Sequence, residues 1–306
     1  SDPGPGEVRL RNNAVGVNYV DTYNRRGMPH PWPVPPLPLI LGFEAAGEVI
    51  SVGPSVEGFA AGDRVAYAMP PHGAYSQERI YPADKLLRVP DGIDDRILAA
   101  VMLKGLTARF LVKDTYAVKP GDIILVHAAA GGVGLILCQW ARDLGATVIG
   151  TVSSDAKAEQ ARAHGCDHVV VYTRDDFVPT VMEVTDGEGC AVVYESIGKD
   201  TFARSLDCLR TMGMLVSYGH ASGAPDPVDV IELGRRSLFV TRPAVMHYMA
   251  KRSDMEAGAA ELFDVIERGS IKISLNHVHP LSEAAEAHRA IEERHTTGST
   301  VLLPFA

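Results

Sequence analysis

The chain has 306 residues, enough for about two domains, and its 46% apolar and 22% charged residues are typical of an ordinary folded protein. Its 29 basic and 38 acidic side chains give a formal net charge of −9, which disfavours general binding to nucleic acid or to a membrane surface. No apolar run reaches the length needed to span a bilayer, and no signal peptide is visible. We therefore predict neither a membrane partner nor a nucleic-acid partner.

The first hundred residues contain short alternating runs separated by glycine turns, which predict an irregular antiparallel barrel. A helical pattern follows from Asp94 to Val112, and Gly105 predicts a break in it. At the other end of the chain, helices are predicted at 255–268 and 284–293 and a strand at 300–303. The strands of the first part are expected at 7–17, within 42–53 and 62–68, at 75–81 and at 85–89, with a short helix at 18–26.

From Ile123 onward, short apolar runs alternate regularly with helical patterns, which is typical of a doubly wound parallel sheet. We therefore expect an α/β protein in which a six-stranded Rossmann domain is joined to the barrel-like part. Strands are predicted at 123–127, 147–152, 168–171, 191–195, 214–218 and 238–241, and helices near 132–144, 156–164, 176–185 and 200–210.

The stretch IILVHAAAGGVG, residues 123–134, joins a buried strand to a helix through a glycine-rich turn. Its spacing is Ala128-x-x-Gly131-x-x-Gly134, with alanine where a dinucleotide-binding fingerprint has its first glycine. Small residues let the backbone approach a pyrophosphate, and the start of the helix offers free N–H groups to it. We favour a dinucleotide site over the alternative, a strand–helix turn that needs glycine only for packing.

The end of the second strand of this sheet indicates which dinucleotide is bound, because an acidic side chain there binds the ribose of NAD and repels the 2′-phosphate of NADP. Ser153 is neutral and Lys157 follows one turn into the next helix, which predicts NADPH. Asp155 is interpreted as a first-turn acid that stabilises the helix start. Lys157 is alternatively an ordinary solvated lysine. Tyr172, after the third strand, is expected to cover the adenosine or to close the sheet edge.

The four cysteines, Cys138, Cys166, Cys190 and Cys208, form no C-x-x-C pair. Two of them, Cys138 and Cys208, fall in stretches with the pattern of amphipathic helices. We interpret all four as reduced structural residues and therefore expect a cytoplasmic protein.

Several motifs spread over nearly the whole chain point to one family. Taken together, they resemble the zinc-independent quinone oxidoreductases of the medium-chain dehydrogenase/reductase superfamily, the group that includes zeta-crystallin. The motifs are VNYVDTY (17–23), GFEAAGEVISVG (42–53), GDRVAY (62–67), LKGLTA (103–108), HAAAGGVG (127–134), ESIG (195–198), SLDCLR (205–210) and TRP (241–243).

The resemblance implies a GroES-like catalytic domain, formed by residues 1–103 and 243–306, and a Rossmann cofactor-binding domain, formed by residues 104–242. It also implies that the first strands of the barrel domain are missing from this sequence. By the same analogy we expect a homodimer, with the apolar strand at 238–241 at the edge where two Rossmann sheets join.

Zinc-dependent relatives hold a catalytic metal through a cysteine and through the histidine of a G-H-E motif. This chain has Asn18 near the first position and Phe43 in place of the histidine, so that neither a thiolate nor an imidazole is available there. We therefore predict no metal site. Without a Lewis acid, the oxidation of an alcohol is disfavoured, and the reduction of an electrophile that accepts hydride readily is favoured.

The resemblance places Asn18 and Lys104 near the cofactor where the two domains meet, with Thr107 one helical turn after Lys104. Asn18 offers an amide near the nicotinamide, or alternatively stabilises a turn. Lys104 supplies positive charge, and the apolar sequence around it argues against an ordinary surface lysine. Further cofactor contacts are expected at the glycine turn and after the fourth and fifth strands, from Gly131, Gly132, Val133, Ser196, Ile197, Gly198, Tyr218, Gly219 and His220.

Tyr23 is expected to line the acceptor pocket and to hydrogen-bond a quinone oxygen, or alternatively to be a packed tyrosine. Trp32 and Tyr67 are expected to add apolar walls, and Arg242 to serve the dimer edge or the pocket. Pro29 stands where some relatives carry an aromatic residue, so the identity of the acceptor stays open.

The main hypothesis is an NADPH:quinone reductase that needs no metal, holds the quinone and the nicotinamide close in a dry interdomain cleft, and takes protons from water. The second is an NADPH-dependent reductase of 2-alkenals or enones, with the same cofactor site and a different pocket. The third is a binding protein with little turnover that uses the nucleotide site structurally or binds RNA, against which the net charge of −9 argues.

Overall fold

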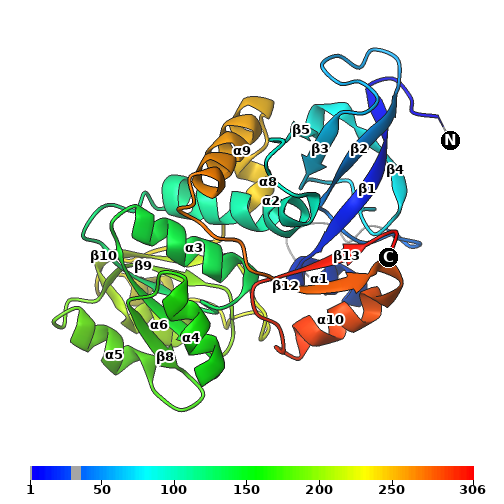
Figure 1. Ribbon diagram of the computed structural model, residues 1–306. Helices are drawn as coiled ribbons and strands as arrows, with labels where there is room; N and C mark the ends of the chain where they lie inside the picture. The colour runs from blue at the N-terminus through cyan, green and yellow to red at the C-terminus, as the bar shows by residue number, and fades with distance from the viewer. Residues whose placement is uncertain (1, 29–35) are drawn as a thin grey trace. The chain divides into compact units, whose positions relative to one another are not determined.

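Figure 1 shows the computed structural model of the protein, which describes residues 2–28 and 36–306. The chain folds into two compact units, each with its own β-sheet. Unit 1 consists of Ser1–Leu106, Met249–Arg268 and Ile273–Ala306, and unit 2 consists of Thr107–Tyr248 and Gly269–Lys272.

The short segment Gly269–Lys272 is tied to unit 2 by one side chain. Gln139 accepts a hydrogen bond from the Lys272 N–H at 2.9 Å and donates one to its carbonyl oxygen at 3.1 Å.

The expected catalytic domain, residues 1–103 and 243–306, and the expected cofactor-binding domain, residues 104–242, remain predictions, because compactness alone does not assign a function to a unit.

Unit 1 is built on a sheet for which the described residues supply seven strands. The strand order is β12-β13-β1-β2-β3-β5, and β4 also pairs with β1. Neighbours are antiparallel except β12 and β13, which are parallel. The strands are β1 (Glu7–Val17), β2 (Ala45–Val52), β3 (Arg64–Tyr67), β4 (Glu78–Pro82), β5 (Leu87–Arg88), β12 (Leu275–Pro280) and β13 (Ser299–Leu303).

The core of unit 1 follows from the alternation of side chains along β1. Val8, Leu10 and Val15 are fully buried in one cluster with Tyr67 and Tyr81. The helices of unit 1 are α1 (Tyr19–Arg26), α9 (Arg252–Glu267) and α10 (Ala284–Glu292), with 3-10 turns η1 (Ala83–Lys85) and η3 (Leu281–Glu283). Helix α10 packs beside α1 (Figure 1).

Helix α2 (Asp95–Phe110) contains the boundary between the units and runs through Gly105 without interruption, so the predicted break is wrong. The glycine serves close packing instead, because a Cβ there would lie 2.6 Å from the side chain of Leu262 in α9. After Phe110 the chain continues in a π-helical turn, η2 (Leu111–Thr115).

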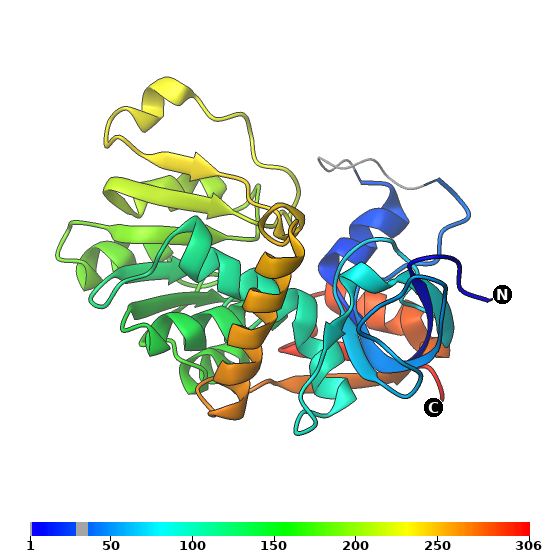
Figure 2. The same ribbon diagram turned by 90° about the horizontal axis from the view of Figure 1, so that it is seen from above.

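Unit 2 contains a six-stranded parallel sheet in the order β11-β10-β9-β6-β7-β8, which Figure 2 shows together with the helices around it. The predicted α/β fold with a doubly wound sheet is confirmed. The strands are β6 (Ile123–Val126), β7 (Thr147–Val152), β8 (His168–Val171), β9 (Cys190–Glu195), β10 (Leu209–Ser217) and β11 (Phe239–Thr241).

The helices α5 and α6 share an apolar cluster with the sheet of unit 2, in which Phe177 and Phe202 meet Leu125 and Val193. The predicted helix at 200–210 is too long, because Leu209 already pairs with β9. The helices are α3 (Gly132–Asp143), α4 (Asp155–Ala163), α5 (Phe177–Val184), α6 (Phe202–Asp207), α7 (Val230–Leu233) and α8 (Val245–Tyr248). None of the helices in the described part of the chain has both the length and the apolar character of a membrane span.

Candidate functional site

The glycine-rich turn joins β6 to α3. Ala128 has a φ of 51°, so the alanine adopts the left-handed geometry for which the fingerprint normally uses glycine. Gly131 is the N-cap of α3, and a Cβ on Gly134 would collide with the carbonyl oxygen of Ala128. The N–H groups of Gly132 and Val133 lie in the first turn, where no acceptor inside the helix is available. The turn therefore offers a close-approach anion site.

The predicted phosphate-binding residues gather where β7 and β8 end. Lys157 lies in the first turn of α4, and its N–H donates to the hydroxyl of Ser154, the N-cap, at 3.4 Å. The Tyr172 N–H donates to the carbonyl oxygen of Val152 at 3.0 Å, which fixes the two strand ends side by side. Ser153 lies at the same edge, directly after β7.

Arg174 is a positive side chain at this edge that the sequence analysis missed. It lies 3.3 Å from the carboxylate of Asp155 and 3.1 Å from that of Asp175. The neighbouring Thr173 hydroxyl donates to the carbonyl oxygen of Ser153 at 3.1 Å. Arg174 therefore offsets the negative charge of Asp155 beside the expected phosphate position. The signal that could have found it is a basic residue shortly after the third strand, which is adjacent to the second.

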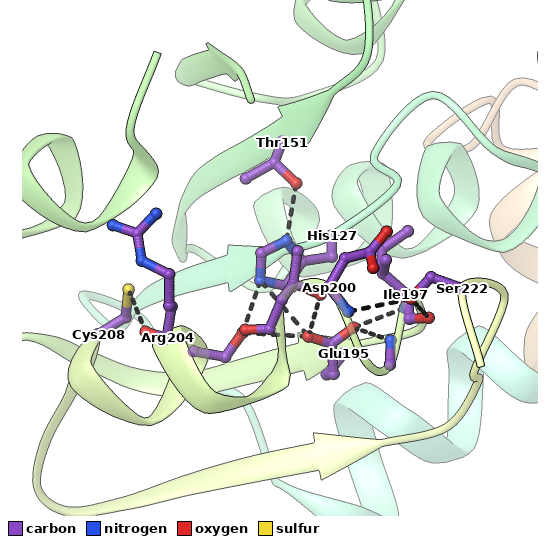
Figure 3. A network of polar contacts seen from close by, with 11 residues as sticks. His127, Thr151, Glu195, Ile197, Asp200, Arg204, Cys208 and Ser222 are labelled. Carbon is purple, nitrogen blue, oxygen red and sulfur yellow. Dashed lines mark hydrogen bonds and ion pairs between the residues drawn. The ribbon is translucent and has the colours of Figure 1, made fainter. Parts of the chain in front are cut away.

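A fully buried glutamate at the end of β9, Glu195, holds the turn that follows it (Figure 3). Its Oε1 atom accepts the N–H of Ile197 at 2.5 Å and the N–H of Gly198 at 3.1 Å. Gly198 has a φ of 90°, which only glycine adopts without strain. The predicted cofactor residues of this turn thus have a fixed backbone shape.

The other carboxylate oxygen of Glu195 belongs to a buried hydrogen-bond network (Figure 3). Its Oε2 atom accepts the hydroxyls of Thr201 at 2.7 Å and Ser205 at 3.1 Å. His127 contacts Ser205 through Nε2 at 2.9 Å and Thr151 through Nδ1 at 2.8 Å. Burial lowers the pKa of His127, against the opposing effect of Glu195, so the imidazole is neutral. Both residues stand in the quoted motifs, yet sequence reasoning gave them no role.

The turn after β10 is held by Arg242. The guanidinium donates to the carbonyl oxygens of Ser217 at 2.8 Å and Gly219 at 3.1 Å. It also lies 2.9 Å from Nδ1 of His220. Tyr218 is half-buried in the same turn, and burial raises the pKa of its hydroxyl. Arg242 thus holds the backbone of this turn, and its expected role at the dimer edge or in the pocket stays a prediction.

The turns after β9 and β10 interlock. A Cβ on Gly219 would lie 2.7 Å from the carbonyl oxygen of Ser196, and the Ser222 N–H donates to the carbonyl oxygen of Ile197 at 2.7 Å. The predicted residues of these two turns are therefore brought together at the carboxyl ends of neighbouring strands, where open α/β sheets bind ligands.

In unit 1, the predicted residues Asn18 and Lys104 meet at a third residue, Glu44. The Nζ atom of Lys104 lies 2.8 Å from Glu44 Oε1, and Nδ2 of Asn18 donates to the same oxygen at 2.7 Å. The Leu103 N–H donates to Oε2 at 2.6 Å. All three side chains are buried, and Glu44 is 0% exposed. Thr107, one turn further along α2, is half-buried.

A second polar chain starts beside this cluster. Asp21 accepts the N–H of Asn18 at 2.9 Å and the hydroxyl of Tyr75 at 3.1 Å, and Tyr75 lies 2.9 Å from Nε2 of His288. Burial raises the pKa of Asp21 to about 7. Burial, together with the charge of Arg25, lowers the pKa of His288 to about 4. At neutral pH the histidine is therefore uncharged, and Asp21 titrates.

The aromatic residues expected at the acceptor differ in their surroundings. Tyr23 is 8% exposed and makes an edge contact with Tyr19, with ring centroids 5.3 Å apart. Tyr67 lies in the core cluster of unit 1 and is 1% exposed, so the expectation that it forms a pocket wall is wrong. Pro29 and Trp32 lie outside the described residues.

Phe43, which replaces the histidine of the zinc-binding motif, packs its ring on His72 with centroids 4.1 Å apart. Within residues 2–28 and 36–306, no three or more histidine, cysteine, aspartate or glutamate side chains form a group that could hold a metal ion.

Two family profiles match the chain. The family described as "Alcohol dehydrogenase GroES-like domain" matches residues 4–91, and the family described as "Zinc-binding dehydrogenase" matches residues 132–264. The first match falls in unit 1. The second begins at α3, after β6, covers the other five strands of the unit 2 sheet and extends into α9 of unit 1.

Curated relatives match almost the full chain. The 2-haloacrylate reductase of a Burkholderia species is 56% identical, over 99% of this chain and 92% of the relative. The quinone oxidoreductase of Pseudomonas aeruginosa is 51% identical, over 99% of this chain and 93% of the relative. Among solved structures, Escherichia coli quinone oxidoreductase complexed with NADPH superimposes with a TM-score of 0.96 at 44% identity, over 99% of this chain and 93% of that one. The chain therefore belongs to the quinone oxidoreductases of the medium-chain dehydrogenase/reductase superfamily.

Proposed function

We propose that this protein is an NADPH-dependent reductase that transfers hydride to a quinone. The observation that carries the proposal is the similarity, over 99% of the chain, to proteins named quinone oxidoreductase, one of which was solved as a complex with NADPH. No metal takes part in the proposed reaction, because Asn18 and Phe43 supply neither a thiolate nor an imidazole.

The turn between β6 and α3 fits a dinucleotide. Gly134 leaves no space for a Cβ against Ala128 and Ala129, so the start of α3 packs closely on the turn, as in a dinucleotide-binding fingerprint. Gly132 and Val133 offer first-turn N–H groups to a pyrophosphate, and Glu195 and Arg242 fix the two turns in which further cofactor contacts are expected. When bound, NADPH supplies the hydride.

The residues after β7 and β8 fit the 2′-phosphate that distinguishes NADPH from NADH. Ser153 offers a neutral donor, and Lys157 and Arg174 add positive charge. The two acids nearby, Asp155 and Asp175, are both paired with Arg174, and a paired carboxylate repels a phosphate less strongly than a lone one. Tyr172 is assigned to the adenosine beside them.

The part of the proposal in which the nicotinamide meets the acceptor rests on Asn18, Lys104 and Tyr23. Negative charge develops on the acceptor oxygen as it receives the hydride, and a buried ammonium stabilises such charge more effectively than it would in water. Lys104 is 6% exposed and provides that charge. Tyr23 is assigned to the pocket wall, and Thr107 is assigned to the cofactor side of α2.

An electron-poor carbon–carbon double bond is the second candidate acceptor. The 2-haloacrylate reductase, at 56% identity, favours it, and the alkenals and enones of the second hypothesis belong to the same chemical class. A nucleotide-binding protein with little turnover is the third candidate.

One assay separates the three. NADPH and NADH oxidation is measured with a panel of quinones, 2-chloroacrylate and 2-alkenals, and NADPH binding is measured separately by fluorescence. We expect quinones to be reduced with NADPH as the better donor. A preference for 2-chloroacrylate or alkenals would move the assignment to the second candidate, and binding without oxidation of NADPH by any acceptor would favour the third.

We also propose a cytoplasmic homodimer. The edge strand β11 of the unit 2 sheet has Phe239 51% exposed. Met212 of β10, whose N–H donates to the carbonyl oxygen of Arg236 shortly before β11, is 67% exposed. An exposed apolar edge strand invites pairing with a second copy. All four cysteines are free and buried, as in a reducing compartment. Light scattering measures the mass of the protein in solution, and the mass of a monomer would contradict the dimer.

A further inference from the structure

Glu44 has no role in the proposed reaction so far, yet it is the most completely enclosed group of the unit 1 cluster. Its carboxylate receives a charged donor from Lys104, an amide donor from Asn18 and a backbone N–H from Leu103. We propose that Glu44 is the positioning residue of the acceptor site, which presents N–H donors of Lys104 and Asn18 together to an oxygen of the acceptor. This inference rests on the proposed function and specifies its acceptor side.

The hydrogen bonds of Glu44 fix the orientation of its carboxylate and the positions of the two side chains that bind it. Lys104 and Asn18 bind the same oxygen, Oε1, so their nitrogen atoms are held next to each other. The Leu103 N–H on Oε2 prevents the carboxylate from turning. Gly16 provides the space, because a Cβ there would collide with the Glu44 carboxylate.

The remaining hydrogen-bonding capacity of the two held side chains determines what they recognise. In the capping box of α1 the Asn18 side chain faces the backbone N–H of Asp21, which donates to the main-chain carbonyl oxygen of Asn18 at 3.0 Å, so its amide oxygen already lies against a donor. An amide nitrogen has two hydrogens and an ammonium has three, and Glu44 takes one from each. What is left is a set of N–H donors beside a positive charge. Such a set fits the carbonyl oxygen of a quinone better than it fits a hydroxyl donor or a cation.

The test compares Glu44→Gln, Lys104→Met and the double variant with the wild type. Glu48→Gln, on strand β2 that begins directly after Glu44, serves as the matched control. Each variant is assayed for quinone kcat and KM over pH, for NADPH affinity by fluorescence and for Tm. We expect Glu44→Gln to lower kcat/KM for the quinone about 100-fold, as for the loss of an oriented oxyanion donor. The NADPH Kd and the Glu48→Gln control should stay close to the wild type.

The pH profile distinguishes positioning from mere structural support. A buried ammonium without its counter-ion gives up its proton at lower pH, so the alkaline fall of kcat should begin earlier in Glu44→Gln than in the wild type. The other titratable groups facing the cluster are Asp21 of α1, whose pKa is raised to about 7, Tyr75, whose pKa is raised, and His288 behind Tyr75. The charge of Glu44 helps to raise the pKa of Asp21 and of Tyr75, so Glu44→Gln also shifts the titration of these two groups. The double variant, which keeps Asp21 and Tyr75 and lacks the ammonium, therefore shows how much of a change in the pH profile they cause.

The double variant separates stability from activity. Removing both buried charges should restore the Tm that either single variant loses, while quinone reduction stays low. Activity that returns with the Tm would show that the pair is structural and would overturn the inference. If the wild type reduces quinone and Glu44→Gln has the same pH profile as the wild type, the inference about Glu44 is overturned and the proposed function stands. A wild type that binds NADPH and reduces no quinone would overturn both.

Discussion

Each unit buries one glutamate completely, and the two glutamates hold different kinds of partner. Glu195 in unit 2 accepts two backbone N–H groups of the turn after it and two hydroxyls. Glu44 in unit 1 accepts the ammonium of Lys104, the amide of Asn18 and one backbone N–H. Glu195 therefore sets the shape of a backbone segment, whereas Glu44 positions side chains that carry charge and donors.

The difference has an energetic consequence. The partners of Glu195 are neutral and remain hydrogen-bonding groups whatever happens to the glutamate. The principal partner of Glu44 is a buried charge, which is costly once its counter-ion is removed. Neutralising the two glutamates should therefore produce different patterns of loss, and the following predictions proceed from the largest expected effect to the smallest.

Lys104→Met leaves Glu44 as an uncompensated buried charge, and we expect it to lower the free energy of unfolding by about 3–5 kcal/mol. The double variant Glu44→Gln/Lys104→Met should be close to the wild type. Urea unfolding of the four proteins measures the coupling. Additive losses in the double variant would contradict the ion-pair account.

Glu195→Gln replaces one acceptor oxygen with an NH2 group that meets N–H or hydroxyl donors, which should cost about 1–3 kcal/mol. Because the affected turn belongs to the expected cofactor site, the NADPH Kd should rise while the quinone KM changes little. Glu188→Gln, at an exposed position before β9, is the matched control. A larger effect of Glu195→Gln on the quinone KM than on NADPH binding would contradict the proposed difference in role between Glu195 and Glu44.

Arg174→Ala and Lys157→Ala should each weaken NADPH binding about tenfold, as for the loss of a charge-assisted contact to phosphate, and affect NADH little. Arg162→Ala, at the exposed far end of α4, is the control. Fluorescence titration with both nucleotides measures the ratio. Equal losses of affinity for NADPH and NADH would show that Arg174 and Lys157 do not bind the 2′-phosphate.

Asp21 and His288 predict opposite effects of pH on stability. The pKa of Asp21 is raised to about 7, so its contribution is present below pH 4 and is lost as pH rises towards 7. The pKa of His288 is lowered to about 4, so its contribution is present above pH 6.5 and is lost as pH falls towards 4. Asp21→Asn should therefore unmask a stability that rises with pH between 4 and 6.5. Urea unfolding across this range would contradict the assignment if the variant and the wild type had the same slope.

Ala128→Gly should raise the free energy of unfolding by only about 0.5 kcal/mol, because relief of the left-handed backbone is partly offset by the greater freedom of glycine when unfolded. Ala128→Val should lower it. Thermal unfolding measures both, and a stabilised valine variant would contradict the positive φ of 51° at this position.

The candidate site of unit 2 could be predicted from the sequence more completely than the cluster around Glu44 in unit 1. The site of unit 2 is made of contiguous stretches, in which the strand, the glycine turn and the helix cap follow one another, so a local pattern indicated it. The cluster of unit 1 joins Asn18, Glu44 and Lys104 from distant parts of the chain, and no spacing connects them. Asn18 and Lys104 were predicted through family motifs, while Glu44 carries no local signal of its burial.

The errors in the fold have the same origin in tertiary contacts. Gly105 has the local signal of a helix break, but packing against Leu262 explains the glycine without one. β12 was not predicted because its sequence, LNHVHP, has no strong strand pattern and depends on pairing with β13. Tyr67 was expected in a pocket wall because it is aromatic, but its place in the sheet of unit 1 puts it in the core.

The central claim is that this protein transfers hydride from NADPH to a quinone. Anaerobic single-turnover mixing of the NADPH-bound protein with a benzoquinone tests it most directly, with the absorbance of the reduced nicotinamide and the hydroquinone product followed together. We predict loss of the reduced nicotinamide in step with formation of an equal amount of hydroquinone, faster than in a mixture without protein. Bound NADPH that stays reduced in the presence of the quinone would contradict the claim.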